Sequence, residues 1–147
     1  MPFTLTKAHN ILEHLFGAKT LTAPEYVYIG LCSNDPEADE GSITELSGNG
    51  YSRVLIARGG QAYPDIMSDG YDRSIWNKVQ INWTKATGDW VDANGFFLAS
   101  SSTVGDTSSI FFYGKLETAV SCKAGEVALF DPNSLRISFP KADVPIT

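Results

Sequence analysis

The first residues of the chain carry apolar side chains at helical spacing. Positions three and four apart are apolar throughout this segment, at Ala8, Ile11, Leu12, Leu15 and Phe16. Thr4 or Thr6 can cap the start of a helix, and Gly17 suits the left-handed position at its C-terminal end. The pattern predicts a helix over residues 1–17. We expect its stripe, from Ile11 to Phe16, to pack at the edge of the structure that follows, because an apolar stripe must be buried on its own domain or on a neighbour.

Beyond residue 25 the period changes to that of strands. Short runs rich in β-branched and aromatic residues occupy residues 26–32, 51–57, 78–83, 95–100, 109–116, 126–130 and 134–139. Turn sequences such as TGDW, VDANG, KAGE and DPNS separate the later runs and leave no room for crossover helices. The sequence predicts a mainly β fold, an antiparallel β-sandwich of jelly-roll type with one N-terminal α-helix. We expect a single domain over residues 1–147, with the sandwich over residues 26–139.

The composition fits a globular protein and argues against two kinds of partner. Of the 147 residues, 43% are hydrophobic and 19% are charged, which suits one packed core. The net charge is -6 and the 11 Lys and Arg residues are scattered, so nucleic acid is not an expected partner. No apolar stretch reaches the roughly 18 residues that span a bilayer, and charged residues interrupt the N-terminal segment. We therefore expect neither membrane insertion nor a signal peptide.

The chain lacks the common catalytic motifs. It contains no G-x-S-x-G elbow, no glycine-rich phosphate loop ending in Lys-Ser/Thr and no Cys-x-x-Cys pair. We therefore expect no enzyme activity and no cofactor. Cys32 and Cys122 stand in or beside apolar segments, which favours buried free thiols and leaves a disulfide between them as the alternative.

Two segments contain residue types that bind metals in other proteins. His9 and His14 are five positions apart, about 140° around a helix, so they do not share one face as an H-x-x-E-H zinc motif requires. The acidic run at residues 34–41 lacks the EF-hand glycine, because Glu40 follows Asp39. We expect no metal site here, only exposed histidines and a solvated loop, with calcium binding by the loop left open.

The stretch TELSGNGYSR combines a turn with polar side chains before an apolar run. Gly48 and Gly50 flank an asparagine, and these residue types accept the positive φ angles that a chain reversal needs. Glu45 and Arg53 stand on either side of the turn, so we expect an ion pair that holds its ends together. Tyr51 is expected to cover the edge of the core with its hydroxyl hydrogen-bonded. These five residues predict a structural brace for the turn rather than a ligand site.

Four segments follow the predicted helix in a distinctive order. They are YVYIGLCSNDP, TELSGNGYSR, INWTKATGDWVDANGFFLASSS and IFFYGKLETAVSCKAGEVALF. The most specific feature is Thr44-Glu45 followed by a glycine turn and Gly50-Tyr51-Ser52-Arg53, with Ala124-Gly125-Glu126 before the final strands. Over nearly the whole chain this order resembles small bacteriophage virion proteins often labelled tail fibre proteins. Residues 61–77 depart from that pattern, because they form a longer and more aromatic insert.

The resemblance implies a non-enzymatic structural protein of the virion, associated with the tail fibre or baseplate or decorating the capsid. Such a protein works by self-association and by docking on other capsid or tail proteins. From the symmetry of phage fibres and decoration proteins we expect a homotrimer. The resemblance also implies that the protein is assembled in the host bacterial cytoplasm.

The insert at residues 61–77 is rich in aromatic residues set among turn formers. Its proline, aspartate and glycine residues predict an irregular surface loop, where exposed aromatic side chains usually signal a contact. Tyr63, Tyr71 and Trp76 are therefore candidates for contact with a neighbouring subunit or with a host-surface glycan. The second use defines an alternative function, that of a carbohydrate-binding adhesin module.

Overall fold

The computed structural model describes residues 3–56, 66–68, 73–77 and 79–139. These residues form the helix α1 (Leu5–Phe16), the 3-10 turn η1 (Thr107–Ser109) and the strands β1 (Val27–Cys32), β2 (Val54–Ile56), β3 (Ile66–Ser68), β4 (Arg73–Trp76), β5 (Ile81–Asn82), β6 (Ala93–Ala99), β7 (Ile110–Val120), β8 (Leu129–Phe130) and β9 (Arg136–Phe139). Each of the seven predicted strands overlaps one of these. The predicted mainly β, antiparallel fold with one N-terminal helix is confirmed.

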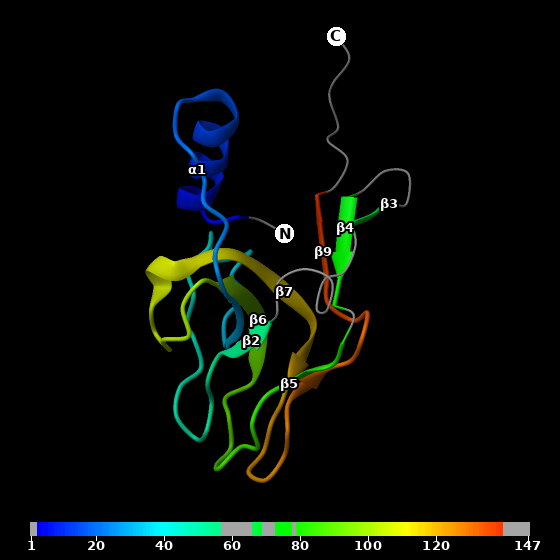
Figure 1. The fold of residues 1–147 in the computed structure, drawn as a ribbon. Helices are drawn as coiled ribbons and strands as arrows, with labels where there is room; N and C mark the ends of the chain where they lie inside the picture. The colour runs from blue at the N-terminus through cyan, green and yellow to red at the C-terminus, as the bar shows by residue number, and fades with distance from the viewer. Residues whose placement is uncertain (1–2, 57–65, 69–72, 78, 140–147) are drawn as a thin grey trace.

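The central sheet has the strand order β2-β1-β6-β7 and is antiparallel throughout (Figure 1). Along β1, Ile29 and Leu31 contribute to one apolar cluster, whereas Cys32 contributes to a second. Along β6, Phe96 and Phe97 divide between the same two clusters. Because successive side chains of a strand point to opposite faces, both faces of these two strands are covered. This explains why they read as nearly continuous apolar runs rather than as alternating ones.

Two smaller sheets contain the remaining strands, in the orders β3-β4-β9 and β5-β8. The prediction of an irregular loop over residues 61–77 is wrong for part of the insert, because β3 pairs antiparallel with β4, with Ile66 opposite Ile75. Strand β4 also pairs with β9, with Ser74 opposite Ser138. The β3–β4 pair is local, and the turn formers around it concealed two short strands. The β4–β9 ladder joins segments far apart in the sequence, so the pattern alone did not reveal it.

Helix α1 is attached to the central sheet mainly through its N-terminal end. Thr4 caps the helix by accepting a hydrogen bond from the Lys7 amide at 3.3 Å, and its own amide donates to the Phe111 carbonyl at 3.1 Å. Just before the cap, the Phe3 ring meets the Phe112 ring edge-on, with 5.3 Å between centroids. In Figure 1 the rest of α1 stands clear of the central sheet at the upper left, and β4 and β9 lie at the upper right.

The expected packing of Ile11, Leu12, Leu15 and Phe16 at the edge of the β structure is wrong for three of these four residues. Leu12 is 56% exposed, Leu15 64% and Phe16 85%, and only Ile11 is partly covered. The helix meets the sheet at its first turn, so the apolar side chains of its later turns find no surface there. Helical periodicity identifies an apolar face but does not identify what covers it.

The C-terminal end of α1 also differs from expectation. Gly17 has φ -104° and ψ -159°, which is extended rather than left-handed backbone. Its amide donates to the Glu13 carbonyl at 2.9 Å, and a Cβ at Gly17 would approach that oxygen to 2.7 Å. Glycine is therefore suited to this position by close approach rather than by a positive φ. Among the described residues, no helix has the length and apolar character needed to cross a bilayer.

Candidate functional site

Glu45 and Arg53 form a buried ion pair with two hydrogen bonds. Arg53 Nε donates to Glu45 Oε1 at 2.8 Å, and Arg53 Nη2 donates to Glu45 Oε2 at 2.9 Å. The Arg53 side chain is 0% exposed and the Glu45 side chain 5%. Buried charges cost free energy unless they are paired and their remaining polar groups are bonded, and this geometry supplies the pairing. The structure thus brings the two ends of the glycine turn together.

The remaining polar atoms of this pair bond to the connection between β6 and β7. The other N–H groups of Arg53 donate to Ser101 O at 2.9 Å, Ser109 Oγ at 3.2 Å and Asp106 O at 3.0 Å. The Gly105 amide donates to Glu45 Oε2 at 2.6 Å. The ion pair therefore joins the turn segment to a connection far along the chain, with protein groups satisfying both charges.

Tyr51 joins the same network from inside the core. Its hydroxyl donates to Glu45 Oε1 at 3.0 Å and accepts a hydrogen bond from the Leu31 amide at 2.9 Å. Burial raises the pKa of this hydroxyl well above its ordinary value, so it stays protonated at alkaline pH at which an exposed tyrosine ionises. The Tyr51 ring meets the Trp90 ring edge-on, with 5.5 Å between centroids. Tyr51 therefore links the ion pair to both β1 and the apolar core.

The glycine turn itself has three consecutive residues at positive φ. The values are 75° at Gly48, 52° at Asn49 and 81° at Gly50, a conformation that glycine and asparagine adopt with little strain. The Asn49 carbonyl accepts from Trp90 Nε1 at 2.9 Å, and the Asn49 side-chain amide donates to the Asp89 carbonyl at 2.8 Å. The turn is therefore fixed to residues 89–90 as well as by the ion pair across its ends.

The guanidinium of Arg53 also lies over an aromatic ring. The Arg53 Cζ atom is 4.9 Å from the centroid of Phe97, and Phe97 lies opposite Gly30 in the β1–β6 ladder. A Cβ at Gly30 would come within 2.1 Å of a ring atom of Phe97, so only glycine leaves room for the ring. Gly30, Phe97 and Arg53 form a stack in which the ring faces the cation.

Sequence reasoning missed the residues outside the turn that contact Glu45 and Arg53. Gly105 and Asp106 act through backbone atoms, which carry no side-chain signal. Phe97 appeared only as one apolar residue of a strand, because its place over Gly30 depends on the register between β1 and β6. The Gly105-Asp106 pair indicates a turn in the sequence but does not indicate what that turn contacts.

Other candidate residues occupy ordinary structural positions. Cys32 and Cys122 are buried free thiols, as predicted, and burial raises the pKa of Cys32 to about 12. His9 and His14 are exposed, and the described residues include no cluster of three or more groups able to hold a metal ion. In the acidic loop, Asp35 Oδ1 accepts hydrogen bonds from the backbone amides of residues 37 and 38.

Of the three candidate aromatic residues of the insert, only Trp76 lies in the part of the chain that the structure describes. Tyr63 and Tyr71 lie outside the described residues. Trp76 belongs to β4, where its backbone pairs with that of Arg136 in β9. The structure therefore puts Trp76 in a strand rather than a loop.

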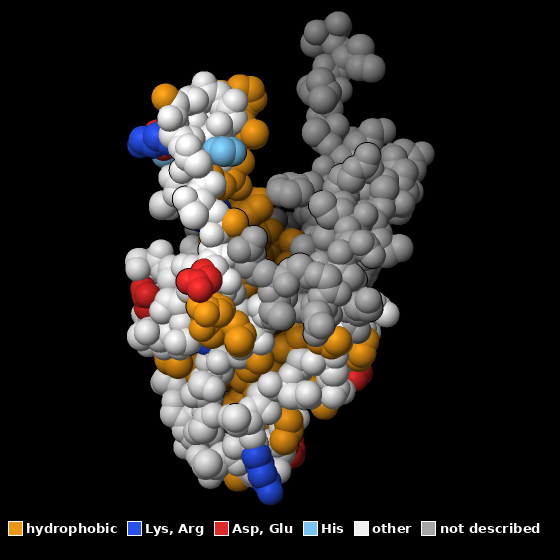
Figure 2. Space-filling model, viewed as in Figure 1, with side chains coloured by type: hydrophobic (Ala, Val, Ile, Leu, Met, Phe, Trp, Pro, Cys, Tyr) orange, Lys and Arg blue, Asp and Glu red, His pale blue; other side chains and the backbone are white. Residues whose placement is uncertain are grey.

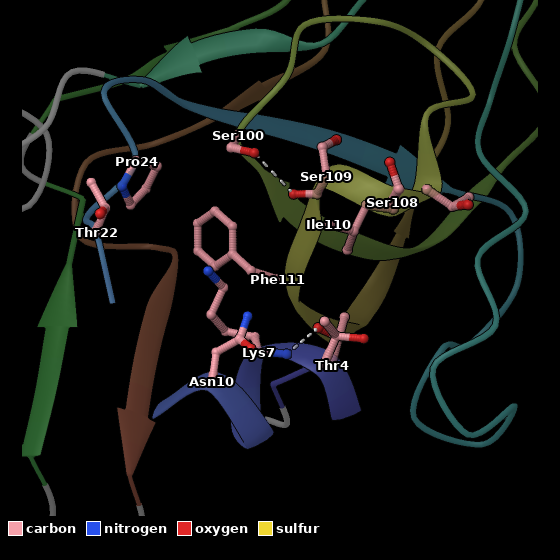
Figure 3. A pocket seen from close by; sticks show the side chains of 12 residues that line it. Thr4, Lys7, Asn10, Thr22, Pro24, Ser100, Ser108, Ser109, Ile110 and Phe111 are labelled. Atoms are coloured by element: carbon pink, nitrogen blue, oxygen red, sulfur yellow. Dashed lines mark hydrogen bonds between the residues drawn. The ribbon is translucent and has the colours of Figure 1, made fainter. Parts of the chain in front are cut away.

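A pocket of about 310 Å³ lies between α1, the segment after it and the start of β7 (Figure 3). Its lining is mostly hydroxyl-bearing, and consists of Thr4, Thr6, Lys7, Asn10, Thr22, Pro24, Ser100, Thr107, Ser108, Ser109, Ile110 and Phe111. Figure 3 shows the Phe111 ring near the middle of this group, with Lys7 and Asn10 reaching toward it from α1. Sequence reasoning gave no indication of this pocket, because its walls come from four separate stretches, residues 4–10, 22–24, 100 and 107–111.

The surface of α1 is apolar along one side. Leu5 is 89% exposed, which extends the exposed stripe of Leu12, Leu15 and Phe16 to the first turn of the helix. Figure 2 shows hydrophobic side chains at the surface of the helix and continuing below it. Glu13 lies outside this stripe and pairs with Lys19 at 3.1 Å. We call Leu5, Leu12, Leu15 and Phe16 the α1 stripe.

Comparison with known proteins accounts for nearly all of the chain. A search of the curated proteins found no match. Residues 2–138 match the family described as Podophage GP4 fiber I protein gp80. This match agrees with the resemblance carried by the motifs around Glu45 and Arg53. The chain belongs to this family of podophage fibre proteins, and its role is that of a structural component of the phage particle.

Proposed function

We propose that this fibre protein acts without catalysis, by self-association and by docking on other proteins of the virion. The observation that carries the proposal is the α1 stripe, four large apolar side chains that are each more than half exposed on one short helix. Their combined area is on the order of several hundred Å², the size of the largest apolar patch on an ordinary monomer. Patches of that size are often functional, and this one lies on a helix whose later turns have, within the described residues, no apolar surface of the sheet to pack on.

The spacing along α1 supports packing against another helix. Leu5 and Leu12 are seven positions apart, as are Ala8 and Leu15, and the two pairs interleave at three- and four-residue steps. This is the spacing of the a and d positions that pack between helices in a bundle. A helix of 12 residues is marginally stable by itself in water, so a partner would also stabilise α1.

A second copy of the chain is the occupant that fits the stripe best. The stripe carries no charge, whereas the chain as a whole carries a net charge of -6, which makes copies repel through most of their surface. Two copies that meet along the stripe bring no like charges opposite each other within it. A standard interface buries about 800 Å² per partner, so the flanks of the helix would contribute the remainder. The expected homotrimer is one closed arrangement of such helices.

Sedimentation equilibrium tests self-association directly. We expect the unaltered protein to have a mass that is a multiple of the monomer, and Leu12→Ser with Leu15→Ser to shift it to the monomer or raise the dissociation constant at least tenfold. The matched control is Leu55→Ser with Val91→Ser, which removes two apolar side chains of similar exposure, 53% and 69%, outside the helix. An unaltered protein that stays monomeric, or equal effects of the two double variants, would contradict the proposal. The mass also decides whether the number of copies is three.

Docking on the particle is tested separately. Virus particles that lack the native protein are mixed with the purified chain and sedimented, and we expect the chain to sediment with them. The double variant Tyr71→Ser with Trp76→Ser asks whether the insert takes part in this contact. Binding that is unchanged in this variant would place the docking surface outside the insert, whether the partner belongs to the capsid or to the tail.

The network of Glu45, Tyr51 and Arg53 has a structural role in this proposal. Its charged and polar atoms are bonded within the chain, and Gly48 and Gly50 shape the turn that brings them together. No atom of the pair requires a ligand to satisfy it. The brace holds the β6–β7 connection and the turn segment together, and so keeps the surface beside α1 in one shape.

Binding of a host-surface glycan is the second candidate function. The sequence observation in its favour is the group Tyr63, Tyr71 and Trp76, and the structural one is the hydroxyl-lined pocket beside α1. A glycan array with the unaltered protein tests this function. Retention of glycan binding by Tyr71→Ser with Trp76→Ser would exclude the insert as the site.

A further inference from the structure

The pocket beside α1 contains several polar side chains that are not engaged elsewhere. Within the part of the chain that the structure describes, the side chains of Thr6, Asn10, Thr22 and Thr107 make no hydrogen bond or ion pair. All four line the pocket. Polar groups that converge on a concave site without partners are available to a ligand.

Of the lining residues that the structure describes, the one charged side chain is a cation. Lys7 lines the pocket, and its ammonium lies 5.6 Å from the centroid of the Phe111 ring. Among the described residues, no carboxylate belongs to the lining, although the chain has 17 acidic residues against 11 basic ones. A lysine without a carboxylate partner in a pocket favours an anionic group, which it attracts as a point charge.

The walls of the pocket are held in place by hydrogen bonds. The Thr4 amide donates to the Phe111 carbonyl at 3.1 Å and fixes the first turn of α1 to β7. On the opposite wall the Ser100 amide donates to the Ser109 carbonyl at 3.0 Å, and Ser109 Oγ accepts from Arg53 at 3.2 Å. The pocket is therefore largely formed before a ligand arrives, which lowers the entropic cost of binding.

We propose that this pocket binds a single acidic sugar unit, a pyranose-sized ring that carries a carboxylate or a phosphate. The hydroxyl and amide side chains of Thr6, Asn10, Thr22 and Thr107 suit sugar hydroxyls, which both donate and accept. The Phe111 ring offers an apolar surface to the C–H groups of the ring. Lys7 binds the anionic substituent. The volume of about 310 Å³ is at the small end of the range for ligand sites, so it suits one unit rather than a long chain.

This inference concerns the second candidate function and does not depend on self-association. Lys7 and the four polar side chains lie outside the α1 stripe, so they can be changed without altering its apolar residues. Failure of sugar binding would therefore leave the proposed self-association standing. Conversely, a monomeric protein could still bind the sugar.

Isothermal titration calorimetry with three probes tests the site, namely glucuronate, glucose 6-phosphate and glucose. We expect at least one of the two anionic sugars to bind at least tenfold more tightly than glucose, and the tighter of them identifies the anion. Lys7→Met keeps the length of the side chain and removes its charge, and it should lower that affinity at least tenfold. Lys85→Met is the control, because Lys85 is exposed and does not line the pocket.

Thr107→Val gives a second, independent test, since it removes a hydroxyl and keeps the shape of the side chain. We expect it to weaken binding of the anionic sugar at least threefold, and thermal unfolding shows whether each variant remains folded. The absence of binding by either anionic sugar would overturn the proposal. So would equal affinity for glucose, or equal effects of Lys7→Met and Lys85→Met.

Discussion

The turn segment and helix α1 differ in whether the chain itself supplies the contacts that their side chains need. The turn segment has buried charges, and α1 has exposed apolar side chains. In the turn segment, Glu45 and Arg53 are charged and buried, and the chain itself satisfies them through paired hydrogen bonds. In α1, Leu12 and Leu15 are apolar and remain more than half exposed. Charged side chains whose hydrogen bonds are made within the chain contribute to its stability. Apolar side chains that the chain leaves exposed are available for contact with another molecule. Changes in the first region should unfold the chain, and changes in the second should alter its associations.

The largest expected effect follows from Arg53→Ala. This change leaves the Glu45 carboxylate buried without its partner, so we expect the free energy of unfolding to fall by about 3–5 kcal/mol. Urea unfolding measures the loss. Lys115→Ala is the matched control, because its ion pair with Asp35, at 3.6 Å, is partly exposed and should contribute at most about 1 kcal/mol.

Glu45→Ala distinguishes a brace from two independent residues. If the two side chains act as one unit, the double variant Glu45→Ala with Arg53→Ala should be far less destabilised than the sum of the single variants, because neither charge is then left unpaired. Additive losses would contradict the paired role. Loss of particle attachment with unchanged stability would instead assign Arg53 to an interface.

The next effect concerns the stack below Arg53. Gly30→Ala places a methyl group where Phe97 lies, and we expect a loss of about 1–3 kcal/mol from the forced displacement of the ring. Adding Phe97→Leu should restore part of this stability, since it removes the ring atoms that the methyl group meets. Circular dichroism melting of the unaltered protein and of the two variants checks both statements. If Gly30→Ala alone were neutral, the close packing of Gly30 and Phe97 would not constrain this part of the sheet.

Tyr51→Phe should produce a smaller loss at neutral pH and a change in pH dependence. The loss of the hydroxyl leaves Glu45 and the Leu31 amide with one hydrogen bond fewer, which costs about 1–2 kcal/mol. The pKa of Tyr51 is raised by burial, so above the unfolded pKa of about 10 the unfolded chain loses this proton and the folded chain keeps it. Stability should therefore fall as pH rises above 10. We expect a shallower fall in Tyr51→Phe when urea midpoints are compared from pH 9 to 11.

The same contrast explains which contacts could be predicted from the sequence alone and which could not. Glu45, Tyr51 and Arg53 lie within one stretch of nine residues, and a glycine turn separates Glu45 from the other two. Local reasoning could therefore suggest their contact. Their further partners, Gly105 and Asp106, use backbone atoms from a connection that only the strand register brings near. The apolar stripe of α1 was also visible as periodicity. Its packing was mispredicted because periodicity describes one face of an element and says nothing of its neighbour.

The smallest expected effect is on the stability of the monomer when the α1 stripe is changed. Leu12→Ser with Leu15→Ser removes side chains that the chain does not cover, so unfolding at protein concentrations below any association should change by no more than about 0.5 kcal/mol. Ile29→Ser, at a fully buried position of β1, is the contrasting core substitution and should cost several kcal/mol. At higher concentration, association should stabilise the unaltered protein but not the double variant, because a partner that binds only the folded state raises apparent stability by mass action. A melting temperature that rises with concentration in the unaltered protein alone would therefore assign the stripe to self-association. Loss of the fold in the dilute double variant would instead make Leu12 and Leu15 part of the core, and the contrast between the two regions would disappear.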